Sequence, residues 1–297
     1  MSAAASVLFD APGPKARLRN HIVTAVVVVL VAAGLWLTIS AFADKGQFAA
    51  DKWTPFLDAA VWETYLLPGL QGTIVAAVLS IVLALVLGML FGILRLSEHR
   101  PVRWFASVVV EVSRAIPVLI LMIFLFAVFA EYNLFASEDL ALAAVVTALT
   151  IYNGSVIAEI VRAGIKSLPR GQTEAAVALG LRKNQLMRLI LLPQAITAML
   201  PALISQMVVA LKDSALGYQI TYVEIVRSGQ QLGSADSNTI PALMVVALVM
   251  ILLNSALTWV ATQVERRLRT RKRKGGTVLA ADSIVTDAAP GVDITKK

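Results

Sequence analysis

The sequence predicts an all-α integral membrane protein with six transmembrane helices and both termini in the cytoplasm. Its 297 residues are 58% hydrophobic and only 15% charged, and the mean hydropathy is +0.77, which is too apolar for an ordinary soluble domain. Uncharged stretches of about 20 residues, the length that a helix needs to cross a bilayer, recur along the chain. Short segments of alternating polarity, which would indicate a β-barrel, are absent from the sequence.

Six stretches are apolar enough to form spans, and each is predicted to be a helix because a helix satisfies its own backbone polar groups in hydrocarbon. The first is long for the core of a signal peptide, so it is retained as a span. The third is short unless it is extended back to about Trp104, which brings Glu111 and Arg114 into its cytoplasmic end. The predicted spans are 22–43, 69–94, 105–130, 140–161, 190–212 and 238–264.

Lysine and arginine are concentrated on one predicted side of the six spans. They fill the N-terminal arm, the second and fourth connections and the segment after the last span, whereas the other connections carry few. Basic residues stay on the cytoplasmic side. The predicted organisation is a cytoplasmic arm over 1–20, a transmembrane domain over 21–264, and a tail over 265–297 that is first basic and then disordered.

The composition also limits the chemistry. The net charge of +7 is spread along the cytoplasmic edges, which does not indicate a nucleic-acid partner. The basic cluster from Arg266 to Lys274 is expected to contact anionic lipid headgroups. Cysteine is absent, and His21 and His99 stand singly among basic residues, so no disulfide or metal site is predicted. The sequence has no G-x-x-x-x-G-K-[ST] loop to cradle phosphates, so neither a cofactor nor enzymatic activity is predicted for this chain.

The connection over 166–189 has an unusual design. Pro169 can open a helix, the following residues are good helix formers, and Gly180 supplies a stop. A second helical segment is expected from Arg182 until Pro193 interrupts it at the membrane. The sequence therefore predicts two short helices, at an angle to each other, that project from the cytoplasmic side.

This connection carries a recognisable motif. Glu174-Ala175-Ala176, three residues, Gly180, nine residues, Ile190, one residue and Leu192-Pro193 resemble the loop that defines permease subunits of bacterial ATP-binding-cassette (ABC) importers. The resemblance implies that 166–189 docks into a groove on a partner ATPase, where ATP is bound, and transmits its motion to the spans. The residues that it implicates are Gly171, Glu174, Ala175, Ala176, Gly180, Ile190 and Pro193.

The resemblance extends to the polar amino-acid branch of that family, which includes histidine, glutamine and glutamate permeases. Segments 159–165, 169–172, 192–195, 200–203 and 211–214 are similar to that branch, and the extended N-terminus, external loop and basic tail are most similar to actinobacterial glutamate permeases. Two departures leave the amino acid open. Arg114-Ala115-Ile116-Pro117 stands where the branch commonly has Arg-Gly-Thr-Pro, and Lys212-Asp213-Ser214-Ala215-Leu216 stands where it commonly has Lys-Asp-Thr-Ser-Leu.

The resemblance also implies the partners. They are an ATPase dimer in the cytoplasm, a second permease subunit that is a copy or a paralogue, and an external solute-binding protein, all acting at a bacterial plasma membrane. A stand-alone secondary transporter or channel for a small polar solute, and a membrane scaffold without a pathway, are the alternatives. Both leave the motif over 174–193 unexplained.

An amino acid that crosses hydrocarbon needs polar partners for both of its charged ends. Each candidate can instead bridge helices, and Arg114 can form an ion pair with Glu111 on the same helical face. Gly88 and Gly92 form a face of small residues that favours close helix packing within the subunit over a dimer interface. The candidate pathway residues are Arg114, Asn153, Ser155, Ser205, Gln206, Asp213 and Ser214.

Overall fold

The computed structural model describes residues 13–275, with side chains as far as residue 267. This part of the chain consists of helices and connections, without a strand. The all-α membrane architecture predicted from the sequence is therefore confirmed. The predicted arm lies within it only from residue 13, and the predicted disordered end of the tail, 276–297, lies outside the described residues.

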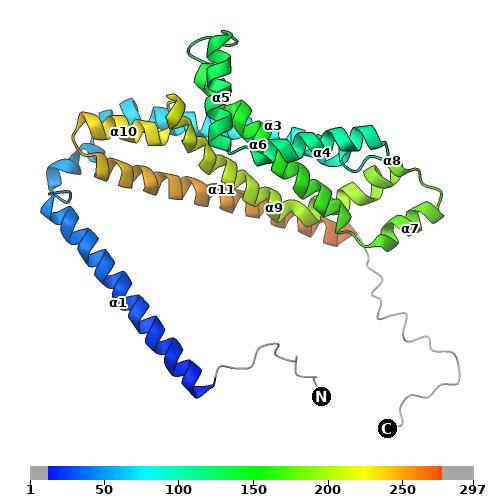
Figure 1. Ribbon diagram of the computed structural model, residues 1–297, viewed down its shortest axis with the longest axis horizontal. Coiled ribbons are helices and arrows are strands. Elements are labelled where there is room, and N and C mark those ends of the chain that lie inside the picture. The colour runs from blue at the N-terminus through cyan, green and yellow to red at the C-terminus, as the bar shows by residue number, and fades with distance from the viewer. Residues whose placement is uncertain (1–12, 276–297) are drawn as a thin grey trace.

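Five helical segments in the described chain are long and apolar enough to cross a membrane. They contain α1 (Pro14–Asp44), α3 (Leu67–Leu94), α6 (Leu140–Lys166), α9 (Leu192–Asp213) and α11 (Thr239–Gly275). Figure 1 shows α3, α6, α9 and α11 running along the long axis of the molecule, whereas α1 diverges from this body. The orientation relative to the membrane stays a prediction.

The third predicted span, 105–130, is not one helix. It is divided into α4 (Arg100–Ala115) and α5 (Val118–Glu131), which meet at 99°. Pro117 has no N–H to continue the α4 ladder, and its ring forces Ile116 into an extended conformation, with φ −86° and ψ 124°. As a result, α4 runs beside the long helices and α5 stands across them (Figure 1).

Two of the three connections on the predicted external side are largely helical. The first consists of short turns, η1 (Ala50–Lys52), η2 (Thr54–Leu57), α2 (Ala59–Val61) and η3 (Trp62–Leu66), which lead into α3. The fifth consists of η5 (Ser214–Ile220) and α10 (Ile225–Ala235). Figure 1 shows α10 at one end of the molecule, and α7 (Arg170–Ala178) and α8 (Lys183–Gln185) at the other end.

The core forms where α6 packs against α3, α5 and α9. A Cβ atom added to Gly88 would come within 2.4 Å of the Ile157 side chain, and one added to Gly92 would come within 2.7 Å of Val161. Glycine is therefore what allows α3 and α6 to approach each other. This agrees with the prediction that the small-residue face of the second span packs within the subunit.

Candidate functional site

The predicted coupling segment begins with α7, whose two ends are set by local sequence. Pro169, with φ −56° and ψ 133°, precedes the first turn. The last turn closes with two hydrogen bonds, from Gly180 N to Val177 O (2.9 Å) and from Leu181 N to Ala176 O (3.1 Å). This pattern is a Schellman motif, which requires a left-handed residue after the helix. Gly180 fulfils that requirement with φ +74°.

The helix after Gly180 differs from the prediction. Pro193 does not interrupt it, because the chain is continuously helical from Lys183 to Ile220. A π-helical turn, η4 (Leu186–Leu191), comes immediately before Leu192 and Pro193. Its wider turn makes room for the proline ring, which would clash with a carbonyl in a regular α-helix. The coupling segment therefore consists of one short helix, α7, and a second helical stretch that begins at Lys183 and runs without a break into α9.

One side of α7 is attached to the core and the other side is open. Ala176 is 1% exposed and joins the cluster that contains Ile165, Leu186 and Leu191. Glu174 and Val177 are exposed, as is Leu179 at 80%. Among the described residues no ion pair joins Glu174 to Arg170, the partner that a purely structural role would favour. Because apolar side chains are exposed beside a carboxylate, this face is suited to a protein partner.

Two polar contacts fix the coupling segment to the spans. Gln194 Nε2 donates to Gln172 Oε1 at 3.3 Å, which joins α7 to α9. Lys183 Nζ lies 3.0 Å from Glu98 Oε1, which joins α8 to the connection between α3 and α4. The remaining coupling candidates lie along the same stretch. Gly171 and Ala175 are exposed on α7, and Ile190 lies half-buried in η4.

Two of the predicted pathway residues bridge helices. Gln206 Nε2 on α9 donates to Asn153 Oδ1 on α6 at 2.7 Å. Asn153 Nδ2 donates in turn to Leu149 O at 2.9 Å. Asn153 is buried in this chain. The contact joins α6 and α9, the two spans that flank the coupling segment.

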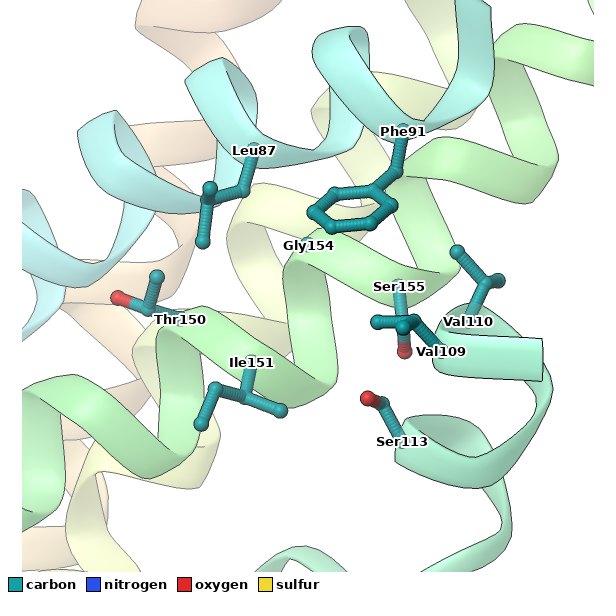
Figure 2. Close-up of a pocket in the computed structure, with 9 residues that line it drawn as sticks. All are labelled: Leu87, Phe91, Val109, Val110, Ser113, Thr150, Ile151, Gly154 and Ser155. Atoms are coloured by element: carbon teal, nitrogen blue, oxygen red, sulfur yellow. The ribbon is translucent and has the colours of Figure 1, made fainter. Parts of the chain in front are cut away.

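Ser155 borders a small cavity between α3, α4 and α6 (Figure 2). The cavity has a volume of about 70 Å³, which suits a few water molecules and not an amino acid. The Ser155 hydroxyl donates to Tyr152 O at 2.6 Å, and buried Thr150 Oγ1 has no hydrogen-bond partner in the described chain. The other lining residues are Leu87, Phe91, Val109, Val110, Ser113, Ile151 and Gly154.

The other pathway candidates lie elsewhere. Ser205 is exposed on α9 and donates to Pro201 O at 3.0 Å. Ser214 is buried and donates to Leu211 O at 2.7 Å, beside half-buried Asp213. Arg114 Nη1 lies 4.0 Å from carboxylate oxygens of both Glu111 and Glu159. The single chain does not gather these residues around one cavity, and their contact with a substrate stays a prediction.

A comparison with protein families shows which family the chain belongs to. The family described as "binding-protein-dependent transport system inner membrane component" matches residues 84–270, from the middle of α3 to α11. The chain belongs to this family. The predictions of an ABC importer permease, of a multi-pass bacterial membrane protein and of a subunit without enzymatic activity are thereby confirmed.

Individual relatives agree with the family. The permease is 61% identical over 231 residues to the glutamate transport system permease protein GluD of Corynebacterium glutamicum, covering 77% of this chain and 85% of the relative. It is 31% identical to the glutamate/aspartate import permease protein GltK of Escherichia coli, covering 68% of this chain and 93% of the relative.

Solved structures resemble its fold. A crystal structure of an amino acid ABC transporter with histidines matches with a TM-score of 0.65 and 27% identity, covering 71% of this chain and 98% of that one. The methionine ABC transporter MetNI, in an inward-facing conformation, matches with a TM-score of 0.60 and 23% identity, covering 69% and 96%. The second likeness concerns the fold alone.

The permease also contains an ion-pair network that sequence reasoning missed. Arg95, at the end of α3, contacts Glu111 on α4 at 2.7 Å and Glu159 on α6 at 2.9 Å. Arg162, one turn further along α6, pairs with Glu159 as well. The predicted Glu111–Arg114 pair is therefore one edge of a network that joins three helices. A lone arginine after a span gives no sequence signal of partners so far along the chain.

A second missed residue is Glu224, which precedes α10. Its carboxylate is fully buried and accepts hydrogen bonds from Val226 N (2.8 Å) and Arg227 N (2.7 Å), so it caps the helix. Burial raises the pKa of Glu224 to about 7, despite these two hydrogen bonds and the nearby charge of Arg227. The neighbouring Ile225 N donates to Thr73 Oγ1 at 3.1 Å, which fixes this corner of the permease to α3.

Proposed function

We propose that this permease imports glutamate or a closely related polar amino acid, which an external solute-binding protein delivers. The observation that carries this proposal is the 61% identity to the glutamate permease of Corynebacterium glutamicum, which extends over 77% of the chain. The glutamate/aspartate permease of Escherichia coli supports the same class of substrate. The working complex has a second permease subunit, which is a copy or a paralogue.

The energy for import comes from ATP that a dimeric ATPase binds in the cytoplasm, and the permease itself needs no cofactor. The ATPase groove accepts α7, whose open face carries Glu174 and Val177, together with Leu179 directly after the helix. Ala176 and the Gln172–Gln194 contact fix the opposite side of α7 to α6 and α9. Closure of the ATPase pair therefore displaces α7 together with the two spans, which alternately opens the pathway to either side.

In this mechanism the polar side chains of α6 and α9 line the pathway that the substrate follows between the two permease subunits. Asn153, Ser155, Ser205 and Gln206 belong to the two helices that α7 moves. Arg114 and Asp213 with Ser214 lie at the ends of neighbouring helical segments. Amide, hydroxyl and charged groups of this kind replace water around the ammonium and carboxylate groups of the cargo.

Transport in reconstituted vesicles tests the substrate. Vesicles that contain the permease, its second permease subunit, the ATPase and the solute-binding protein should accumulate labelled glutamate only when ATP is present. A panel of labelled glutamate, aspartate, glutamine, arginine and histidine should rank the two acidic amino acids first. Uptake that follows an ion gradient without ATP would contradict the mechanism, and preference for a basic amino acid would contradict the substrate.

A matched pair of glycine variants tests the coupling role. Gly180 and Gly46 both have positive φ, +74° and +61°, and an added Cβ meets nothing within 4 Å at either position. Backbone strain is therefore similar in Gly180→Arg and Gly46→Arg. Gly180→Arg should abolish glutamate uptake and stimulated ATP hydrolysis, because it alters the docking helix. Gly46→Arg should preserve both, and normal uptake by Gly180→Arg would refute the coupling role.

A further inference from the structure

A basic cavity lies between the ends of α3, α4 and α6. Of its lining residues only Lys166, the first residue of 166–189, belongs to the coupling segment, and none is a pathway candidate. Its volume is about 440 Å³. Five of its seven lining side chains are cations, and no lining side chain is acidic. The lining residues are Arg95, Arg100, Arg103, Trp104, Ser107, Arg162 and Lys166.

The cations of this cavity are only partly neutralised by the protein. Glu159 pairs with both Arg95 and Arg162, and Glu111 pairs with Arg95. No ion pair within the described residues reaches Arg100, Arg103 or Lys166. Like charges gathered in one hollow repel one another unless a counter-ion joins them. The cavity therefore has an excess of positive charge that an anion would relieve.

Arg95 adds a second and independent indication of an anion. Its side chain is only 8% exposed, and its Nε atom has no hydrogen-bond partner in the described part of the chain. A buried guanidinium donor without an acceptor is costly. An oxyanion seated in the cavity, which Arg95 lines, would offer acceptors beside this guanidinium.

The first turn of α4 supports the same conclusion. Arg100, Arg103 and Ser107 follow one another at helical spacing and line one side of the cavity. No acidic residue lies in that turn. Cations near a helix N-terminus are unfavourable because that end of the helix dipole is positive, whereas an anion there is favourable.

The outer face of α4 indicates what kind of anion fits. Trp104, which also lines the cavity, is 69% exposed, and Phe105, Val108 and Val112 are exposed further along the helix. A tryptophan beside arginines is typical of the headgroup level of a bilayer. A free anion would use the cations and leave this apolar strip unused.

We propose that the cavity binds an anionic phospholipid. Its phosphate lies among Arg95, Arg100, Arg103, Arg162 and Lys166, and an acyl chain follows Trp104, Val108 and Val112 along α4. The bound lipid completes the charge balance of the α3–α4–α6 junction in the cytoplasmic leaflet, where the basic residues of this junction are predicted to lie. This inference does not depend on which solute the permease carries.

Native mass spectrometry of the full-length permease in detergent, titrated with phosphatidylglycerol, tests the proposal. The variant Arg100→Gln/Lys166→Gln removes two cations from the cavity that make no hydrogen bond or ion pair within the described chain. It should bind the lipid about 25-fold more weakly, if each cation contributes about a factor of 5. The control Lys15→Gln/Arg19→Gln removes two exposed cations from α1 and should bind as the wild type does.

The other arms of the titration identify the ligand. Phosphatidylcholine should bind far more weakly than phosphatidylglycerol, because it has no net charge. Inorganic phosphate and glutamate should not displace the lipid at concentrations that are similar to the lipid concentration. Unchanged affinity in Arg100→Gln/Lys166→Gln, equal binding of phosphatidylcholine, or displacement by either soluble anion would each overturn the proposal.

Discussion

Helices α1 and α6 are both long and apolar, yet only α6 is packed within the molecule. The most apolar window of α1 has a mean hydropathy of 2.7, against 1.8 for α6. None of the most apolar window of α1 is buried, whereas 56% of the corresponding window of α6 is buried. The more hydrophobic helix is therefore the one that contributes no buried residue to the described structure.

The difference shows which features distinguish the packed helix. They are small residues and polar side chains that contact a neighbouring helix, and not a high mean hydropathy. Apolar side chains gain little by leaving lipid for protein, so helices associate through close contact and hydrogen bonds. α6 supplies both, with Gly154 beside α3 and Asn153 bonded to α9. α1 offers aliphatic side chains, and the hydroxyls of Thr38 and Ser40 donate to backbone carbonyls of α1 itself, at 2.9 and 3.0 Å.

The largest effect is expected from glycine substitutions that separate the two helices. Gly88→Leu should lower the free energy of unfolding by about 3 kcal/mol, because the new side chain meets Ile157 and Gly154 O at the α3–α6 contact. At Gly34 in α1 an added Cβ meets nothing within 4 Å, so Gly34→Leu should change the free energy of unfolding by less than about 0.5 kcal/mol. Thermal unfolding in detergent measures both. Equal effects of the two substitutions would remove the distinction between α1 and α6.

The buried cap of α10 should make the packed part of the permease sensitive to pH. The pKa of Glu224 is raised from 4.5 to about 7 in the folded protein, so folding favours its protonated form. The contribution of Glu224 to stability should be greatest below about pH 4.5 and should fall by roughly 3 kcal/mol as the pH rises through 7. Stability measured at several pH values tests this expectation.

The matched control for Glu224 is another carboxylate that caps a helix. Glu224→Gln should flatten the pH dependence, because glutamine can still accept hydrogen bonds and does not titrate. Asp58 caps α2 from an exposed position by accepting from Ala60 N at 3.0 Å, so Asp58→Asn should keep the wild-type dependence. An unchanged slope in Glu224→Gln would assign the pH effect to another group.

The Asn153–Gln206 contact should have a smaller, measurable effect. A double-mutant cycle of Asn153→Ala and Gln206→Ala should give a coupling free energy of about 1 kcal/mol, the usual size for hydrogen bonds between helices in membranes. Thr38→Ala on α1 should change stability by much less, because its hydroxyl serves only its own helix. Zero coupling in the cycle would argue that the two amides act on the substrate and do not join the helices.

The smallest effect is expected from removing α1 altogether. Deletion of residues 1–46 keeps Gln47 O, which accepts from Trp53 Nε1 at 2.8 Å. Thermal unfolding of the remaining chain should stay within about 0.5 kcal/mol of the full-length protein, since α1 contributes no buried residue. A large loss of stability would show that α1 packs against the body in the membrane.

Much of this architecture could be predicted because bilayers impose strong local rules. Hydropathy identified the apolar helices, and the spacing of Gly88 and Gly92 identified the α3 face that packs against α6. The motif from Glu174 to Pro193 identified the family. Each of these signals depends on residues that are close together in the sequence.

What escaped prediction depends on geometry or on distant partners. Pro117 lies inside an uncharged run, and hydropathy cannot show that the chain turns by 99° there. The partners of Arg95 lie 16 and 64 residues away, so only the folded chain brings them together. Glu224 resembles an ordinary polar residue of a connection until α3 and α10 enclose it. The pathway candidates lie at separate places in the described chain, and their contact with a substrate stays a prediction.

The way in which α7 is attached has a consequence for the whole transport cycle. Its connections to α6 and to α8 are only a few residues long, and Ala176 lies in the same apolar cluster as Met199 and Leu203 of α9. A force on α7 therefore cannot be absorbed by a slack tether. Under the proposed coupling, such a force should tilt α6 and α9 together, so that both helices are displaced at once.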